Sequence, residues 1–83
     1  MKFKIVKSEL VEQRETHVYT LDQQQIHIIR INGKPVNAVI RPGKLNKDGE
    51  FIMDGRQEAL FVDIEESRMK ALIKVLKEVY GDL

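Results

Sequence analysis

The stretch IHIIRINGKPVNAVIR, residues 26–41, decides the fold that the sequence predicts. Two runs rich in isoleucine and valine, 26–31 and 34–41, flank the dipeptide Asn32-Gly33. Asn-Gly favours the type I′ turn, whose backbone twist matches that of two paired strands. The stretch therefore predicts an antiparallel β-hairpin with strands at 26–31 and 34–41.

A regular two-residue turn would pair Ile31 with Lys34 and His27 with Ala38, which assigns each side chain to one face of the hairpin. One face would be apolar enough to lie on a core, with Ile29, Ile31, Val36, Ala38 and Ile40. The other face would carry Arg30, Asn37 and Arg41 among Ile26, Ile28 and Val39. The pattern thus predicts a basic surface with apolar patches on the side away from the core.

Strand-like patterns occur on both sides of this hairpin. Residues 2–7 alternate lysine with apolar side chains, 17–21 are β-branched and aromatic, and 59–64 alternate again. These patterns predict strands at about 2–7, 17–21 and 59–64, with a connection or irregular edge at 8–15. Turn dipeptides at 42–43, 48–49 and 54–55 predict a long loop over 42–58, with room for a short ribbon around 51–53.

The hydrophobic period changes after residue 64. Apolar residues then follow helical spacing from about 65 to 80 and stop at Gly81, with Asp63 or Ser67 as candidate N-caps. The apolar surface is wider than one sheet face needs, because Ala71 and Val75 add a second row to the main stripe. The helix therefore predicts a homodimer, with an interface of Met69, Leu72, Leu76, Val79 and Tyr80. A broad core stripe with some exposed aliphatic side chains is the alternative interpretation.

Together these elements predict an α+β fold, one domain over residues 1–83 with an antiparallel sheet of four to five strands before one C-terminal helix. A chain of 83 residues with 42% hydrophobic residues and a net charge of +1 supports one modest globular core. It has no cysteine, so disulfides and thiolate metal sites are excluded. No apolar run approaches the roughly 20 residues of a membrane span, and the first residues do not resemble a signal peptide. We therefore expect a cytoplasmic protein without a membrane partner, nucleoid-associated if it is bacterial.

The residues available for catalysis predict a protein that is not an enzyme. Ser8 and Ser67 are the only serines, neither lies in a Gly-x-Ser-x-Gly motif, and no glycine-rich phosphate loop occurs. If 16–21 and 24–31 paired as a hairpin, His17 and His27 would come close and form half of a metal site, but no third ligand is evident. Two strand histidines without a metal are the preferred interpretation, and we expect no catalytic residue and no cofactor.

The charge distribution is more informative than the net charge. From residue 26 to residue 47 the chain has five basic residues and no acidic one: Arg30, Lys34, Arg41, Lys44 and Lys47. The remaining 61 residues hold nine basic and 13 acidic residues, so the chain is dipolar. A basic sheet face and loop fit a polyanion, and Phe51, Phe61 or Tyr19 could stack on unpaired bases. A solvated basic face without a ligand is the alternative.

Four short segments resemble the transcriptional positive cofactor 4 family, small single-stranded-DNA-binding coactivator-like proteins with bacterial relatives. Residues 2–5, KFKI, are similar to the opening strand of that family, and 39–41, VIR, to its aliphatic-x-Ile-Arg strand. Residues 47–50, KDGE, and 54–56, DGR, are similar to its Gly-Glu and Gly-Arg before the last strand. The chain departs from the family at 42–44, where an aromatic residue is often found, and at 57–58, where lysine and glycine are usual.

The resemblance implies a curved sheet, two subunits that pair through their helices, and sheet faces that bind single strands. Arg41 matches a DNA-contacting arginine of the family. We therefore expect single-stranded DNA binding with little sequence preference and a coactivator-like role in transcription or DNA maintenance, with RNA left open. The nucleic-acid-binding residues would be Lys4, Arg30, Arg41, Lys44, Lys47, Phe51 and Arg56. The alternative is a small homodimeric protein-interaction module or regulator that does not bind nucleic acid.

Overall fold

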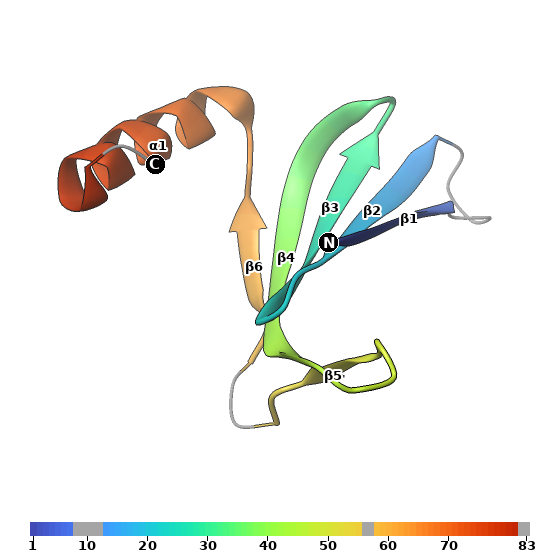
Figure 1. The fold of residues 1–83 in the computed structure, drawn as a ribbon. Coiled ribbons are helices and arrows are strands. Elements are labelled where there is room, and N and C mark those ends of the chain that lie inside the picture. Colours follow the sequence, from blue (N-terminus) through green and yellow to red (C-terminus); the bar gives the residue numbers. More distant parts are fainter. Residues whose placement is uncertain (8–12, 56–57, 82–83) are drawn as a thin grey trace.

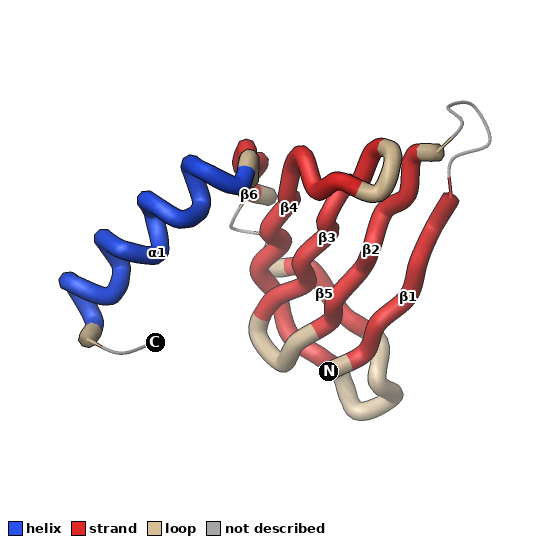
Figure 2. Tube along the Cα trace, turned by 90° about the horizontal axis from the view of Figure 1, so that it is seen from above, coloured by secondary structure: helices blue, strands red, loops and turns tan. Residues whose placement is uncertain are grey.

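The computed structural model describes residues 1–7, 13–55 and 58–81. Its antiparallel sheet is curled into a half-barrel, and one C-terminal helix projects away from the sheet (Figures 1 and 2). The elements in chain order are β1 (Lys2–Lys7), β2 (Arg14–Thr20), β3 (Gln24–Ile31), β4 (Lys34–Leu45), β5 (Phe51–Met53), β6 (Leu60–Asp63) and α1 (Glu66–Tyr80). Neighbouring strands pair in the order β1-β2-β3-β4, and both β5 and β6 pair with β4.

The predicted antiparallel sheet and C-terminal helix are confirmed, but the described residues form six strands instead of four to five. β1 and α1 match the predicted bounds to within one residue, whereas β2 and β3 begin earlier than predicted. The prediction of a loop over 42–58 is wrong in part. β4 continues through Leu45, and β5 forms at 51–53, where the sequence left room for a short ribbon.

The central hairpin has the predicted turn but not the predicted register. Asn32 and Gly33 both have positive φ, 53° and 79°, as a type I′ turn requires. Next to the turn, Ile31 pairs with Lys34 as predicted and Arg30 pairs with Pro35, but beyond these pairs the register shifts and Ile29 lies opposite Asn37. Val36 is the extra residue of a β-bulge. Proline cannot donate to the ladder and is tolerated at bulges, which is the physical reason why the irregularity falls beside Pro35.

This bulge overturns the predicted division of side chains between the two faces. Ile26 and Ile28 share a face with Ile40 and Ala38, because those residues are direct partners. We call this side the outer face; it also carries Arg30, Phe3, Ile5, His17 and Tyr19. The opposite side, the inner face, carries Gln25, His27, Ile29, Asn37, Val39 and Arg41. Arg30 and Arg41 therefore lie on opposite faces, and the prediction that they share one is wrong.

The ribbon formed by the end of β4 and by β5 folds across the inner face at one end of the sheet (Figure 1). Asn46 shapes its turn, since the Asn46 side-chain oxygen accepts hydrogen bonds from the backbone N–H groups of Asp48 and Glu50, at 2.9 and 2.8 Å. The Lys2 ammonium donates to the Gly49 carbonyl at 2.7 Å and so ties the turn to β1. The fold thus brings the two ends of the curled sheet together around the inner face.

The helix begins after Glu65, not after either of the predicted caps. The Glu65 carboxylate accepts from the Ser67 hydroxyl and from the Ser67 backbone N–H, the latter at 3.2 Å, and these two hydrogen bonds lower the pKa of Glu65. Asp63 instead accepts from the Glu65 N–H and from Arg68. Gly81 ends the helix with a positive φ of 81°, as predicted. No residue of α1 is buried, so its apolar stripe is not covered within the described part of the chain.

Candidate nucleic-acid interface

Two rows of side chains cross the inner face from strand to strand. Direct cross-strand pairing places Lys2, Thr20, Gln25 and Arg41 in the first row. The second row consists of Lys4, Val18, His27, Val39 and Phe61. Neither row contains an acidic residue, whereas each contains basic side chains. Because paired strands lie about 4.8 Å apart, the two rows place the positive charges of Lys2, Lys4 and Arg41 on one face with no acidic neighbour in either row.

A hydrogen-bond network on Gln25 organises the polar centre of these rows. The Gln25 amide nitrogen donates to the Thr20 hydroxyl at 3.0 Å. The Gln25 amide oxygen accepts from the Arg41 guanidinium at 3.3 Å and bonds to His27 Nε2 at 2.8 Å. Arg41 also contacts the Met53 sulfur of β5 at 3.5 Å. The network holds a guanidinium and an imidazole side by side, each with polar atoms left for a ligand.

Within the described chain, the basic side chains of the inner face are not neutralised by nearby carboxylates. Among the described residues, neither Lys4 nor Arg41 has a carboxylate within ion-pair distance, whereas Lys7, Arg68 and Lys70 form ion pairs elsewhere. Partial burial, together with the charges of Arg41 and Lys4, lowers the pKa of His27 below its usual value of 6.5. The inner face therefore disfavours one further positive charge in the absence of an anion.

A cavity of about 280 Å³ opens between β1, β2 and the β4–β5 ribbon. Phe51 lines it from the ribbon, Lys4 from β1, and Thr20 and Gln25 from the first row. Gly43 allows this close approach, since a Cβ atom there would lie less than 3.0 Å from the Ile52 carbonyl oxygen and from the Phe51 ring. An aromatic ring beside a lysine and an amide is a combination that can stack a base and contact its phosphate.

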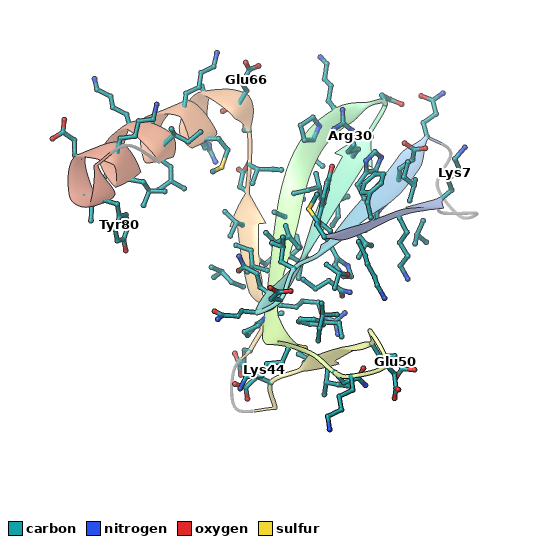
Figure 3. All side chains as sticks on the ribbon, in the orientation of Figure 1. Lys7, Arg30, Lys44, Glu50, Glu66 and Tyr80 are labelled. Atoms are coloured by element: carbon teal, nitrogen blue, oxygen red, sulfur yellow. The ribbon has the colours of Figure 1, made fainter. Side chains whose placement is uncertain are left out.

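The structure brings together only some of the residues that the sequence predicted for this site. Lys4 and Arg41 lie on the inner face, and Phe51 lies beside Lys4 in the cavity. Lys44 is exposed and pairs with Ile52, on the side of the ribbon away from Phe51, and Lys47 is exposed in the turn. Figure 3 shows Lys44 and Arg30 at opposite ends of the sheet.

Arg30 does not belong to the group around Arg41. It lies on the outer face opposite Glu15, and its guanidinium donates to the Gly33 carbonyl at 2.5 Å. The predicted site residue Arg56 lies outside the described residues. Of the other aromatic candidates, Phe61 is on the inner face and 63% exposed, whereas Tyr19 packs against Phe3 on the outer face, with 4.9 Å between ring centroids.

The two histidines do not form half of a metal site. His17 pairs with Ile28 and lies on the outer face, where Nε2 is 3.2 Å from a Glu15 carboxylate oxygen. His27 lies on the inner face. In the described ranges, 1–7, 13–55 and 58–81, no group of three or more metal-ligating side chains comes together.

Sequence reasoning missed Lys2, Gln25 and His27 as members of the basic face. Each is assigned to it only by the pairing of β1, β2 and β3 with one another and with β4, and the bulge at Val36 makes the β3–β4 register irregular. Alternation within β3 was visible in the sequence and relates Gln25 to His27. It could not show that Arg41 shares their face.

Comparisons of the chain with protein families, with curated proteins and with solved structures found no match. In the part of the chain that the structure describes, α1 is too short and too polar to cross a membrane.

Proposed function

We propose that this chain binds single-stranded nucleic acid on its inner face, preferring DNA with little dependence on sequence, and that it is not an enzyme. The observation that carries the proposal is the acid-free pair of rows that hold Lys4, His27 and Arg41, next to a cavity lined by Lys4, Gln25 and Phe51. Phosphates would lie along the cations, while a base would stack on Phe51. A coactivator-like role in transcription or DNA maintenance stays a prediction from the resemblance.

The shape of the inner face favours a single strand over a duplex. The sheet is curled and the β4–β5 ribbon lies over one end, so the basic rows lie in a concave surface (Figures 1 and 2). The bases of a duplex are already stacked and paired, and their faces are not accessible to Phe51. The faces of unpaired bases are accessible, and stacking tolerates every base, which accounts for little sequence preference.

The test is fluorescence anisotropy of a labelled single strand of about 20 nucleotides at two salt concentrations, with the matching duplex and an RNA strand alongside. Arg41→Ala should weaken binding about tenfold and reduce the slope of log affinity against log salt by about 0.7, because one phosphate contact is lost. Arg30→Ala is the matched control, since it removes the same charge from the outer face and should change both quantities little.

Wild-type protein that does not bind the single strand at low salt would overturn the proposal. Equal losses in Arg41→Ala and Arg30→Ala would show that binding depends on net charge instead of the inner face. Stronger binding of the RNA strand than of the DNA strand would support the inner face as the binding site but overturn the proposed preference for DNA.

We also propose that two copies pair through α1. The chain exposes 6887 Å², about 1,800 Å² more than the roughly 5,100 Å² expected for a folded monomer of its mass. Only Val18 and Ala38 are buried hydrophobic residues in the described chain. Obligate dimers bury roughly 2,000–5,000 Å² in total. The excess exposed area of two chains together falls within this range.

The surface available for such pairing is mostly apolar. A groove of about 840 Å³ separates the start of β4 from α1 and is lined by Val36, Ile64, Met69 and Ile73, with Lys34, Glu65 and Glu66 as its charged residues. Beyond it, the helix exposes further apolar side chains, among them Leu72, Val75, Val79 and Tyr80. A second copy carries the same surface, so a two-fold arrangement would cover both.

The exposed helix also favours the second candidate function, a homodimeric protein-interaction module. A protein partner that binds this apolar surface would do so with little salt dependence, unlike a nucleic acid. Binding of a protein partner together with failure to bind any single strand would favour this candidate.

A further inference from the structure

His27 occupies the middle of the inner face, in the row between Lys4 and Phe61. Its Nε2 bonds to the Gln25 amide oxygen, while the Gln25 amide nitrogen donates to Thr20. Since an amide oxygen only accepts, this arrangement assigns the hydrogen of the neutral ring to Nε2. Nδ1 is then the nitrogen that gains a proton when the ring becomes charged.

The charged groups that face this ring are all positive. Lys4 reaches it from β1 and Arg41 from β4, while its direct cross-strand partners, Val18 on β2 and Val39 on β4, carry no charge. The acidic side chain on the inner face of the described strands is Asp63, in another row, and it accepts a hydrogen bond from Arg68 at 2.6 Å. No carboxylate in either basic row stabilises a protonated ring.

We propose that His27 is a proton-dependent phosphate ligand, so that the inner face binds a single strand more tightly as the pH falls. This inference rests on the proposed function. A phosphate placed between Lys4 and Arg41 offsets their repulsion of a charged ring and accepts a hydrogen bond from Nδ1. Binding and protonation therefore favour each other, and each must strengthen the other to the same extent.

The test measures anisotropy with an oligothymidylate of about 20 nucleotides at about pH 7.5, 6.5 and 5.5 and at constant ionic strength. Thymine bases do not titrate over this range, so a change in affinity reports on the protein. Wild-type binding should tighten about three- to tenfold from pH 7.5 to 5.5, which corresponds to a rise of up to about one unit in the pKa of His27 upon binding.

His27→Gln and His17→Gln are the matched variants. Both replace a strand histidine by an amide of similar size, but His27 lies on the inner face and His17 on the outer face. His27→Gln should bind with an affinity that does not change over this pH range, whereas His17→Gln should keep the wild-type pH dependence. Circular dichroism of both variants verifies that they are folded.

A second measurement follows the His27 ring by NMR in wild-type protein, with and without the oligothymidylate. The pKa of His27 should rise when the strand is bound. Strand binding of equal strength at every pH, or an unchanged pKa of His27 upon binding, would overturn the role of His27 and leave the proposed function standing. Absence of strand binding at every pH would instead overturn the proposed function itself.

Discussion

At the scale of single residues, Gln25 determines how the basic side chains of the inner face are arranged. It is the common hydrogen-bond partner of Thr20, His27 and Arg41, which come from three strands. A neutral amide can hold two potential cations together, because its oxygen accepts from both and carries no net charge that would cancel theirs. The positive potential of the site is thus preserved for a ligand.

The free energy of unfolding of the free protein should decrease as the pH falls, whereas its proposed affinity for a single strand should increase. Burial, Arg41 and Lys4 lower the pKa of His27 in the folded chain, so the unfolded chain binds the proton first as the pH drops below about 6.5. The free energy of unfolding should therefore decrease from that pH down to the folded pKa. Urea unfolding of wild type and His27→Gln at about pH 7.5 and 5.5 measures it.

Between about pH 7.5 and 5.5, the free energy of unfolding should decrease less in His27→Gln than in wild type, because the variant lacks the titrating ring. His17→Gln is again the control, since His17 lies beside the Glu15 carboxylate instead of two cations. An identical pH dependence in wild type and His27→Gln would contradict this prediction.

At the scale of elements, the β4–β5 ribbon decides where Phe51 lies. The β4 end is paired on both sides: Gly43 and Leu45 donate backbone hydrogen bonds to Gln23 and Asp22 of the β2–β3 turn, and β5 pairs on the other edge. The ribbon is therefore part of the sheet and presents Phe51 from a fixed backbone, which would reduce the entropy lost in the proposed stacking of a base.

Gly43→Ala should displace this ribbon. A methyl group at residue 43 would collide with the Ile52 carbonyl and with the Phe51 ring, and such overpacking costs about 1–3 kcal/mol. Urea unfolding should show this loss, and affinity for the single strand should fall with it. Gly55→Ala is the control, because nothing lies within 4 Å of a Cβ atom there. A Gly43→Ala protein as stable as wild type would contradict the close approach.

At the scale of the whole molecule, the chain is too extended to bury a large core by itself. Its radius of gyration is 14.4 Å, compared with about 12 Å expected for a compact chain of this length. The helix accounts for much of the difference, because it leaves the sheet at β6 and does not return to cover a face (Figure 2). Pairing with a second copy would supply the missing burial.

Leu76→Glu should convert the proposed dimer into a monomer. A carboxylate in the apolar stripe would have to be desolvated in the interface, which is unfavourable without a partner charge. Light scattering coupled to gel filtration gives the mass in solution. Lys74→Glu places the same carboxylate on the polar side of α1 and should leave the mass unchanged. Wild-type protein that is already a monomer would contradict the proposal.

The sequence by itself determined the elements that depend on local chemistry. The Asn32-Gly33 turn, the alternation in β1 and the helical stripe ending at Gly81 were each visible in a few consecutive residues. The sequence also indicated Lys4, Arg41 and Phe51 as candidate ligand contacts, and all three lie on or beside the inner face.

Only the tertiary structure decided which side chains share a face. One extra residue, Val36, reverses the alternation of β4 relative to β3, which separates Arg30 from Arg41 and joins Arg41 to Gln25 and His27. The pattern around Val36 is equally apolar in either register, so local sequence could not distinguish them. The basic rows consist of side chains from several strands, so they form only when those strands, from β1 to β6, are paired. For that reason the fold class was readable from the sequence, whereas the composition of the candidate site was not.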